Sequence, residues 1–199
     1  TNEFLLITDA TETTLDIWIN NELIPTDVAV ADIFDGDLHR LSVTWTASSG
    51  WLQVFLDGSL LWEEWNIDEA RTPISAGGTL IFGQDQDGNA PGGGFSTAQA
   101  LHGAIGDVRI FEGQRSEEQI AENALLDTAS LRDDSRLVAS WQFDPDAPDQ
   151  QISLGDPLTT FGTVTVEELS DRAGQDTSDL LLGGDGADTL IGGTDNDTL

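Results

Sequence analysis

The end of the chain, residues 174–199, repeats with a period of nine residues. Each row begins with glycine and has aspartate in sixth place and leucine in eighth: Gly174, Gly183 and Gly192; Asp179, Asp188 and Asp197; Leu181, Leu190 and Leu199. Glycine allows tight turns with positive φ, and aspartate supplies the hard oxygen that Ca²⁺ prefers. A flexible acidic linker has no reason to space its leucines. The period therefore predicts the start of a parallel β-roll that binds Ca²⁺.

The rows at 183–191 and 192–199 resemble the RTX (repeats-in-toxin) family. This resemblance implies type I secretion and a chain that folds outside the cell, where calcium is abundant. Asp195 replaces the third glycine of its row, a variant that weakens the turn. The calcium ligands that the repeats imply are Gly183, Asp185, Asp188, Gly192, Thr194 and Asp197.

Composition agrees with an exported, calcium-rich setting. The net charge is −30, and all 7 basic residues are arginine. The electrostatic field of such a negative charge repels nucleic acids and anionic membranes and attracts divalent cations. There is no cysteine for a disulfide and no apolar run of about 18 residues for a membrane span, so we expect metal to stabilise the fold and no membrane insertion. Because methionine and a signal peptide are absent, we expect a piece of a longer protein.

The first part of the chain has short, alternating runs of β-branched and aromatic residues. Leu41, Val43 and Trp45 alternate with polar residues, which predicts one buried face and one wet face. Asp57-Gly58 signals a hairpin. Ser116 and Gln119 suit the capping box of a helix predicted over 116–126. The predicted strands are 4–8, 14–20, 22–25, 39–47, 52–56, 59–65, 78–82, 104–111 and 137–143. Many short strands and one short helix predict an all-β antiparallel sandwich.

The same part of the chain resembles the pentraxin and laminin-G group of concanavalin A-like jelly rolls. The resemblance rests on the segments 38–45, 49–50, 54–58, 80–87, 93–95, 101–103 and 105–111, and it continues to the closing strand with Trp141. It implies a jelly-roll domain over 1–165 whose leading strands are missing. A linker over 166–173 and the calcium-binding repeats over 174–199 then follow.

In pentraxins two calcium ions lie close together and bridge to phosphorylated head groups or sugars. Asp85 and Asp87 match the carboxylates that bridge both ions, and Gln86 matches a backbone carbonyl ligand. Asn2 matches an amide ligand and Gln99 a ligand to the second ion. Two positions depart from the family pattern, with Thr1 in place of aspartate and Ser96 in place of glutamate. The resemblance therefore implies one good calcium site and one weakened site.

The acidic loop has the same chemistry when it is considered without the family. Asp85, Asp87 and Asn89 offer oxygen donors at alternate positions, which suits calcium better than zinc or iron. Ala90 and Ser96 occupy the places where an EF-hand needs glycine and glutamate, so the loop is no EF-hand. The alternative is a solvated acidic turn, because Asp, Gly and Asn form turns without metal.

Other chemically suggestive residues favour structural roles. His39 and His102 fall at strand edges, and the chain has neither a cysteine nucleophile nor a Gly-x-Ser-x-Gly elbow. Six tryptophans raise the possibility of a sugar-stacking surface; we expect Trp45 and Trp141 to be buried and at least one other to be exposed. Those whose exposure the pattern leaves open are Trp18, Trp51, Trp62 and Trp65.

Three functions follow as hypotheses. The first is a non-enzymatic, calcium-dependent module of a large secreted bacterial RTX adhesin or exoprotein, which binds a glycan or another cell-surface ligand. The second is an accessory domain of a secreted glycoside hydrolase, although the acidic stretch 63–69 lacks the Glu-x-Asp-x-x-Glu spacing of a catalytic strand. The third is a structural spacer that calcium makes rigid. The sequence leaves the ligand and the oligomeric state open.

Overall fold

The computed structural model describes residues 4–8, 11, 13–71, 73, 80–83, 100, 101, 103, 105, 107–124, 126, 128–131 and 133–141. The chain divides into two compact units. The first comprises Thr1–Gly78 and Gly113–Leu125, and the second comprises Thr79–Glu112 and Leu126–Leu199.

The first sheet of the first unit is antiparallel, with the strand order β1-β2-β3. Its strands are β1 (Phe4–Thr8), β2 (Thr14–Ile19) and β3 (Glu22–Ala29). The β2–β3 turn consists of Asn20 and Asn21, whose φ angles are 53° and 68°. Two positive φ angles make a type I′ turn, and asparagine tolerates them better than most residues. The β2 side chains alternate between buried and half-buried, as a strand with one core face requires.

A bulge interrupts the pairing of β2 with β3, because Thr14 pairs with Ala29 whereas Asp16 pairs with Pro25. The buried hydroxyl of Thr26 donates to the carbonyl oxygen of Leu15 at 2.5 Å and accepts from the Val28 amide at 3.2 Å. One side chain thus supplies the partners that the interrupted ladder does not. The single-turn helix α1 (Val30–Ile33) follows.

The second sheet of the first unit has the strand order β4-β5-β6 and is also antiparallel. Its strands are β4 (Leu41–Thr46), β5 (Trp51–Leu56) and β6 (Ser59–Glu64). Asp57 and Gly58 connect β5 to β6 with φ angles of 50° and 81°, and Leu56 pairs with Ser59. The hairpin that Asp57-Gly58 predicted is therefore confirmed, as a two-residue type I′ turn.

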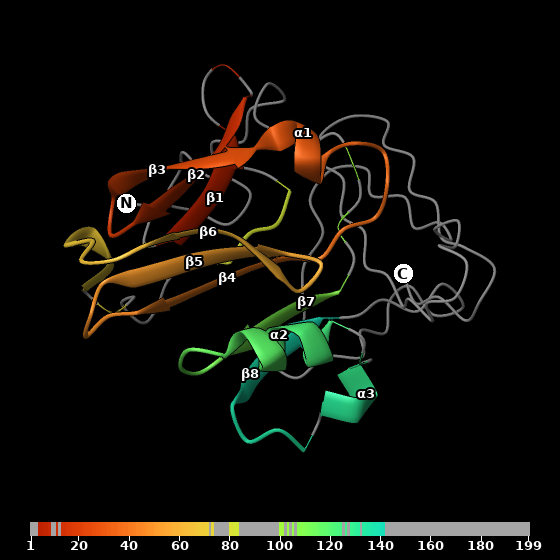
Figure 1. Ribbon diagram of the computed structural model, residues 1–199. Coiled ribbons are helices and arrows are strands. Elements are labelled where there is room, and N and C mark those ends of the chain that lie inside the picture. The colour runs from red at the N-terminus through yellow and green to blue at the C-terminus, as the bar shows by residue number, and fades with distance from the viewer. Residues whose placement is uncertain are drawn as a thin grey trace. The chain divides into compact units, whose positions relative to one another are not determined.

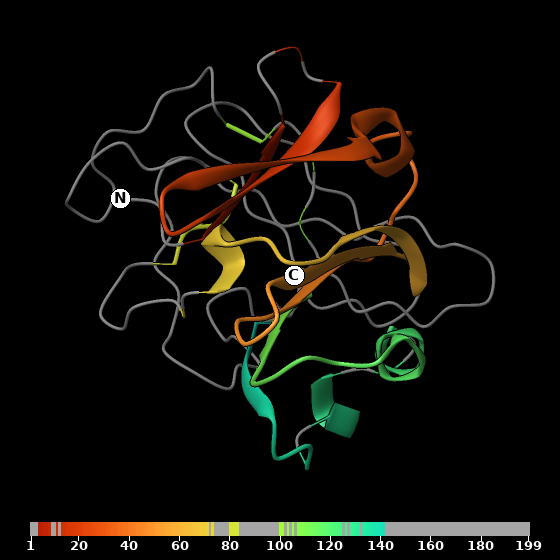
Figure 2. The same cartoon turned by 60° about the vertical axis from the view of Figure 1, so that its left-hand side comes forward.

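The two three-stranded sheets lie as two layers, which Figures 1 and 2 show from different sides. The first sheet contributes Leu15, Ile17, Ile19, Ile24 and Val28 to the core between them. The second sheet contributes Leu52 and Val54, and the segment around η1 (Glu69–Arg71) contributes Ile67 and Ala70. Partly buried side chains close the margin, among them Phe4 and Trp45, whose rings stack with centroids 5.2 Å apart. This apolar burial is the main force that holds the layers together.

The opposite face of the second sheet is also covered, which the sequence pattern of β4 did not predict. Thr44, expected to be wet, is only 7% exposed, and Phe55 is fully buried. Helix α2 (Glu117–Asn123), from the same unit, packs against β6, and a Cβ added to Gly58 would lie 2.9 Å from the Cα of Ala121. The cover comes from residues far along the chain, so local alternation could not reveal it.

The second unit contains a two-stranded antiparallel sheet and a short helix, β7 (Val108–Phe111), β8 (Leu137–Trp141) and α3 (Thr128–Leu131). Arg109 forms a buried ion pair with Asp107 and donates to the carbonyl oxygen of Leu126 at 2.5 Å. Residues 80–82, part of a predicted strand, are not in a strand.

The predicted fold class is confirmed, with antiparallel sheets and a short helix. The capping box is also confirmed, since the Gln119 amide donates to Ser116 Oγ at 3.3 Å and the Ser116 amide donates to Gln119 Oε1 at 3.1 Å. The helix itself is shorter than predicted. The single turns α1 and α3 were not predicted from the sequence. The predicted parallel β-roll over 174–199 lies outside the described residues.

Candidate functional site

Within the second unit, the chain on either side of the acidic segment is tied together. The Leu101 amide donates to the carbonyl oxygen of Gly83 at 2.8 Å. Phe82, immediately before Gly83, meets the ring of the buried Trp141 edge-on, with centroids 5.5 Å apart. Gly83 has a φ of 76°, which glycine adopts without strain. The described residues that precede and follow the predicted calcium loop are thus joined by a hydrogen bond and anchored by an aromatic contact.

The predicted calcium ligands themselves lie outside the described residues. They are Asn2, Asp85, Gln86, Asp87 and Gln99 of the jelly-roll site, and Gly183, Asp185, Asp188, Gly192, Thr194 and Asp197 of the repeats. In the part of the chain that the structure does describe, no group of three or more His, Cys, Asp or Glu side chains could hold a metal ion. The calcium ligand sets remain predictions.

The second sheet of the first unit carries an indole pair. Trp51 begins β5 and Trp65 follows β6, and their rings stack with centroids 3.9 Å apart and planes 10° apart. Trp65 is 52% exposed. The expectation that at least one tryptophan is exposed is therefore confirmed. Trp141 is buried as predicted, whereas Trp45 is only half-buried, beside Phe4 at the margin of the core.

A chain of hydrogen bonds runs across the same sheet beside the indole pair. Thr46 Oγ1 donates to Gln114 Oε1 at 2.6 Å, and Gln114 Nε2 donates to Gln53 Oε1 at 2.9 Å. Gln53 Nε2 donates to Glu63 Oε2 at 3.3 Å. The same carboxylate oxygen accepts from Trp51 Nε1 at 3.0 Å. Four polar side chains and one indole are thus fixed relative to one another.

This cluster was not predicted from the sequence, although a signal was present. A two-residue turn at Asp57-Gly58 fixes the hairpin register. Counting back from this turn places Trp51, at the start of β5, opposite the end of β6. Trp65 follows directly after β6. The contribution of Gln114 had no local signal, because it lies 61 residues from Gln53 in sequence.

His39 lies between two carboxylates at the start of the second sheet. Its Nδ1 is 2.8 Å from Asp57 Oδ2, and its Nε2 is 3.0 Å from Asp35 Oδ1. The bond to Asp57 is the main cause that raises the pKa of His39 above its ordinary value of 6.5, and the bond to Asp35 adds to it against the opposing effect of burial. Asp57 Oδ1 also accepts from the Arg40 amide at 2.9 Å. Nδ1 of His39 thus links the chain before β4 to the β5–β6 turn, and Nε2 links it to Asp35, which follows α1. His102 lies outside the described residues.

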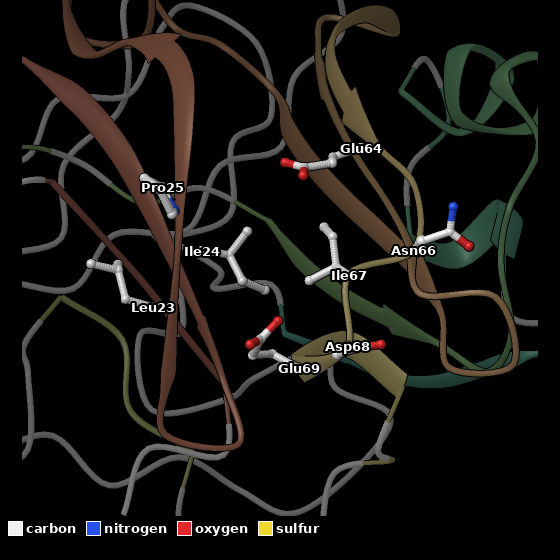
Figure 3. Close-up of a pocket in the computed structure, with 8 residues that line it drawn as sticks. All are labelled: Leu23, Ile24, Pro25, Glu64, Asn66, Ile67, Asp68 and Glu69. Carbon is white, nitrogen blue, oxygen red and sulfur yellow. The ribbon is translucent and has the colours of Figure 1, made fainter.

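A pocket of about 360 Å³ lies between β3 and the segment after β6, within the first unit. Figure 3 shows Ile24 and Ile67 turned toward each other, with Glu64 and Glu69 on either side. The described residues, these acids included, form no group of three that could hold a metal ion. The residues that line the pocket are Leu23, Ile24, Pro25, Glu64, Asn66, Ile67, Asp68 and Glu69.

Comparison with known proteins adds the family context. Residues 1–141 match the model of the Pentaxin family. Neuronal pentraxin-2 from Homo sapiens is 36% identical over 124 residues, which are 60% of this chain and 28% of that protein. Neuronal pentraxin-1 from Homo sapiens is 30% identical over 140 residues, which are 66% of this chain and 30% of that protein. The chain thus spans less than a third of the length of these relatives.

One solved structure also matches. An S-layer domain-containing protein from Clostridium thermocellum aligns over 62% of this chain and 64% of its own, with 16% identity and a TM-score of 0.37. No helix in the described part of the chain has the length and apolar character needed to cross a bilayer.

Proposed function

Because this chain belongs to the Pentaxin family, we propose that it is a non-enzymatic, secreted module that binds its ligand through calcium. The observation that carries the proposal is the family match over residues 1–141, which includes the acidic segment 85–87 and Gln99. The ligand class that we propose is a glycan or another oxygen-rich cell-surface group. Such groups can complete the coordination shell of a protein-bound calcium ion.

The residue types present fit calcium. Asp85 and Asp87 supply carboxylate oxygens, Gln86 a backbone carbonyl, and Asn2 and Gln99 amide oxygens. This donor set is all oxygen, and Ca²⁺ takes six to eight such ligands. The hydrogen bond from Leu101 to Gly83 supports the proposal, because it fixes the chain two residues from Asp85 and two from Gln99. Bound calcium would supply the positive charge that an acidic protein otherwise lacks for holding ligand oxygens.

The repeats over 174–199 extend the proposal. We assign them to a calcium-dependent β-roll that follows a jelly-roll domain over 1–165 and a linker over 166–173. Their resemblance to RTX rows supports type I export from a bacterium and folding outside the cell. The net charge of −30 supports the same order of events, because cation binding relieves the self-repulsion of the compact chain.

Calorimetry on the full chain tests the loop. Calcium is titrated into the metal-free protein, and into a variant that carries both Asp85→Asn and Asp87→Asn. We expect the variant to bind fewer calcium ions and to keep those of the repeats. The matched control carries Asp27→Asn and Asp32→Asn, two exposed positions on and after β3, and makes the same change in net charge. An unchanged stoichiometry in the loop variant would contradict the calcium site.

A glycan array then tests the function. The full chain is applied with calcium and with a chelator, and binding that requires both calcium and the two loop aspartates supports the proposal. The structural spacer is the alternative, and Ser96 favours it, since this residue replaces a carboxylate of the second ion. A chain that binds calcium but no surface ligand would support the spacer. Release of reducing sugar from polysaccharides would instead point to hydrolysis.

A further inference from the structure

The Trp51–Trp65 pair presents one flat apolar surface to water. One face of the Trp65 indole lies against Trp51, with centroids 3.9 Å apart, and yet Trp65 is 52% exposed. The exposure therefore belongs largely to the opposite face and the edge of the ring. An indole held in this way offers a large contact area with little loss of side-chain entropy on binding.

A carboxylate and amides lie beside the indole pair. Both hydrogen bonds that Trp51 Nε1 and Gln53 Nε2 donate to Glu63 go to Oε2. Glu63 is solvent-exposed, so its Oε1 can accept hydrogen bonds from a ligand. Gln53 and Gln114 are held in fixed orientations by their mutual bond and by Thr46. The surface thus combines an apolar floor with one exposed carboxylate, that of Glu63, which the buried Gln53 and the half-buried Gln114 help to hold in place.

The segment that carries Trp65 is fixed to the β4–β5 turn. The Ile67 amide donates to the carbonyl oxygen of Gly50 at 3.0 Å. Arg71 donates from Nη1 to the carbonyl oxygen of Ser48 and from Nη2 to Asn66 Oδ1, both at 3.2 Å. These bonds hold the residues directly after Trp65. The surface is therefore preorganised, which lowers the entropic cost of binding.

We propose that the Trp51–Trp65 pair, with the Glu63 carboxylate, binds a pyranose ring of a neutral glycan without calcium. A pyranose has a face of C–H groups, which lies favourably on the electron-rich face of an indole. Its equatorial hydroxyls lie at the ring edge, where Glu63 can accept from them. The negative charge of Glu63 and the net charge of −30 disfavour sulfated and uronic sugars. None of the predicted calcium ligands belongs to this surface, so the inference stands or falls separately from the proposed function.

The test uses the full chain in a chelator, with cellohexaose, laminarihexaose, N-acetylchitohexaose and maltohexaose as probes. We expect at least one of these sugars to protect Trp65 from oxidation by N-bromosuccinimide, read by mass spectrometry. Trp65→Ala should weaken the binding of that sugar by about tenfold or more, as the loss of one stacked ring implies. The sugar affinity of Trp65→Phe should lie between those of the natural chain and of Trp65→Ala. The midpoint of thermal unfolding should change little in Trp65→Ala, because the side chain is 52% exposed.

Two controls separate this surface from other causes. Leu23→Ala removes another exposed apolar side chain, 43% exposed on β3, and should leave sugar binding unchanged. The Asp85→Asn, Asp87→Asn variant should bind the neutral sugars as well as the natural chain does. The proposal is overturned if none of the four sugars protects Trp65, if the chelator abolishes binding, or if Trp65→Ala binds equally well. Protection by dextran sulfate or by polyproline in place of the neutral sugars would overturn it as well.

Discussion

Nδ1 of His39 lies 2.8 Å from Oδ2 of Asp57, which joins the chain before β4 to the turn between β5 and β6. The His39 side chain is 9% exposed and that of Asp57 is 42% exposed. The same turn residue accepts from the Arg40 amide through Oδ1. A single aspartate thus forms the hairpin turn, holds the neighbouring strand and pairs with an imidazole.

This contact predicts a pH-dependent stability. The bond to Asp57 raises the pKa of His39 above 6.5, so the folded state binds a proton more tightly than the unfolded state does. The stabilisation is fully present below the unfolded pKa and is lost as the pH rises through the raised, folded pKa. Asp57→Asn should therefore lower the free energy of unfolding by roughly 1 kcal/mol in mild acid, a modest value because water screens the exposed carboxylate.

Urea unfolding at about pH 5.5 and about pH 8.5 measures this difference, because the first pH lies below the ordinary histidine pKa and the second well above it. Asparagine is the suitable replacement, since it tolerates the φ of 50° at this position and its Oδ1 can still accept from Arg40. We expect the difference between natural chain and variant to shrink at the higher pH. An equal loss at both pH values would mean that the charge on His39 contributes nothing.

Thr26 gives a second prediction, at the bulge between β2 and β3. Thr26→Val keeps the shape of the side chain but removes the partner of the Leu15 carbonyl and of the Val28 amide. Because this region is buried, the change should cost about 1–3 kcal/mol of unfolding free energy. Thr11→Val is the control, since the Thr11–Thr13 hydrogen bond is exposed, and its loss should cost less than about 0.5 kcal/mol. Equal effects would show that the bulge does not depend on Thr26.

Gly50 gives a third prediction, which separates steric clash from backbone strain. A Cβ added there would lie 2.3 Å from the carbonyl oxygen of Ile67, and the φ is 62°. Gly36 has a φ of 99° with nothing within 4 Å of its added Cβ. Gly36→Ala should therefore cost only the strain, about 1–2 kcal/mol. Gly50→Ala should cost at least about 2 kcal/mol more, because backbone must move. Thermal unfolding of the two variants makes the comparison, and equal midpoints would contradict it.

The features that the sequence could predict are those that local residues determine. Asp57-Gly58 sets a hairpin because two adjacent residues tolerate positive φ. Ser116 caps the helix that begins at the next residue, together with Gln119, which lies three residues after Ser116. The burial of Thr44 and the hydrogen bond from Thr46 to Gln114 both depend on residues far along the sequence. That hydrogen bond joins residues 68 positions apart, and no local pattern encodes it. The stacking of Trp51 on Trp65 lies between these cases, because it needs the register of one hairpin.

The two predicted calcium sites, the acidic loop and the repeats, rest on different observations. The calcium ligands around Asp85 and Asp87 came from residue chemistry and from a family resemblance, and the match of residues 1–141 now supports the family. The ligand geometry stays a prediction. The repeats over 174–199 rest on their periodicity and on their resemblance to RTX rows, because the family match ends at residue 141. For that segment the physical test is whether calcium binding and folding are coupled.

Calcium should fold the repeats and stabilise the chain as two separable events. The variant Asp188→Asn, Asp197→Asn removes the sixth-place aspartates of two rows, and calcium should then induce a smaller rise in β-structure in circular dichroism. The thermal shift that belongs to the loop should remain, since a site filled at a hundredfold its Kd adds about 2.7 kcal/mol. The Asp85→Asn, Asp87→Asn variant should show the converse, a normal rise in β-structure and a smaller thermal shift. If either pair of changes abolished both responses, the division into two calcium-binding parts would be wrong.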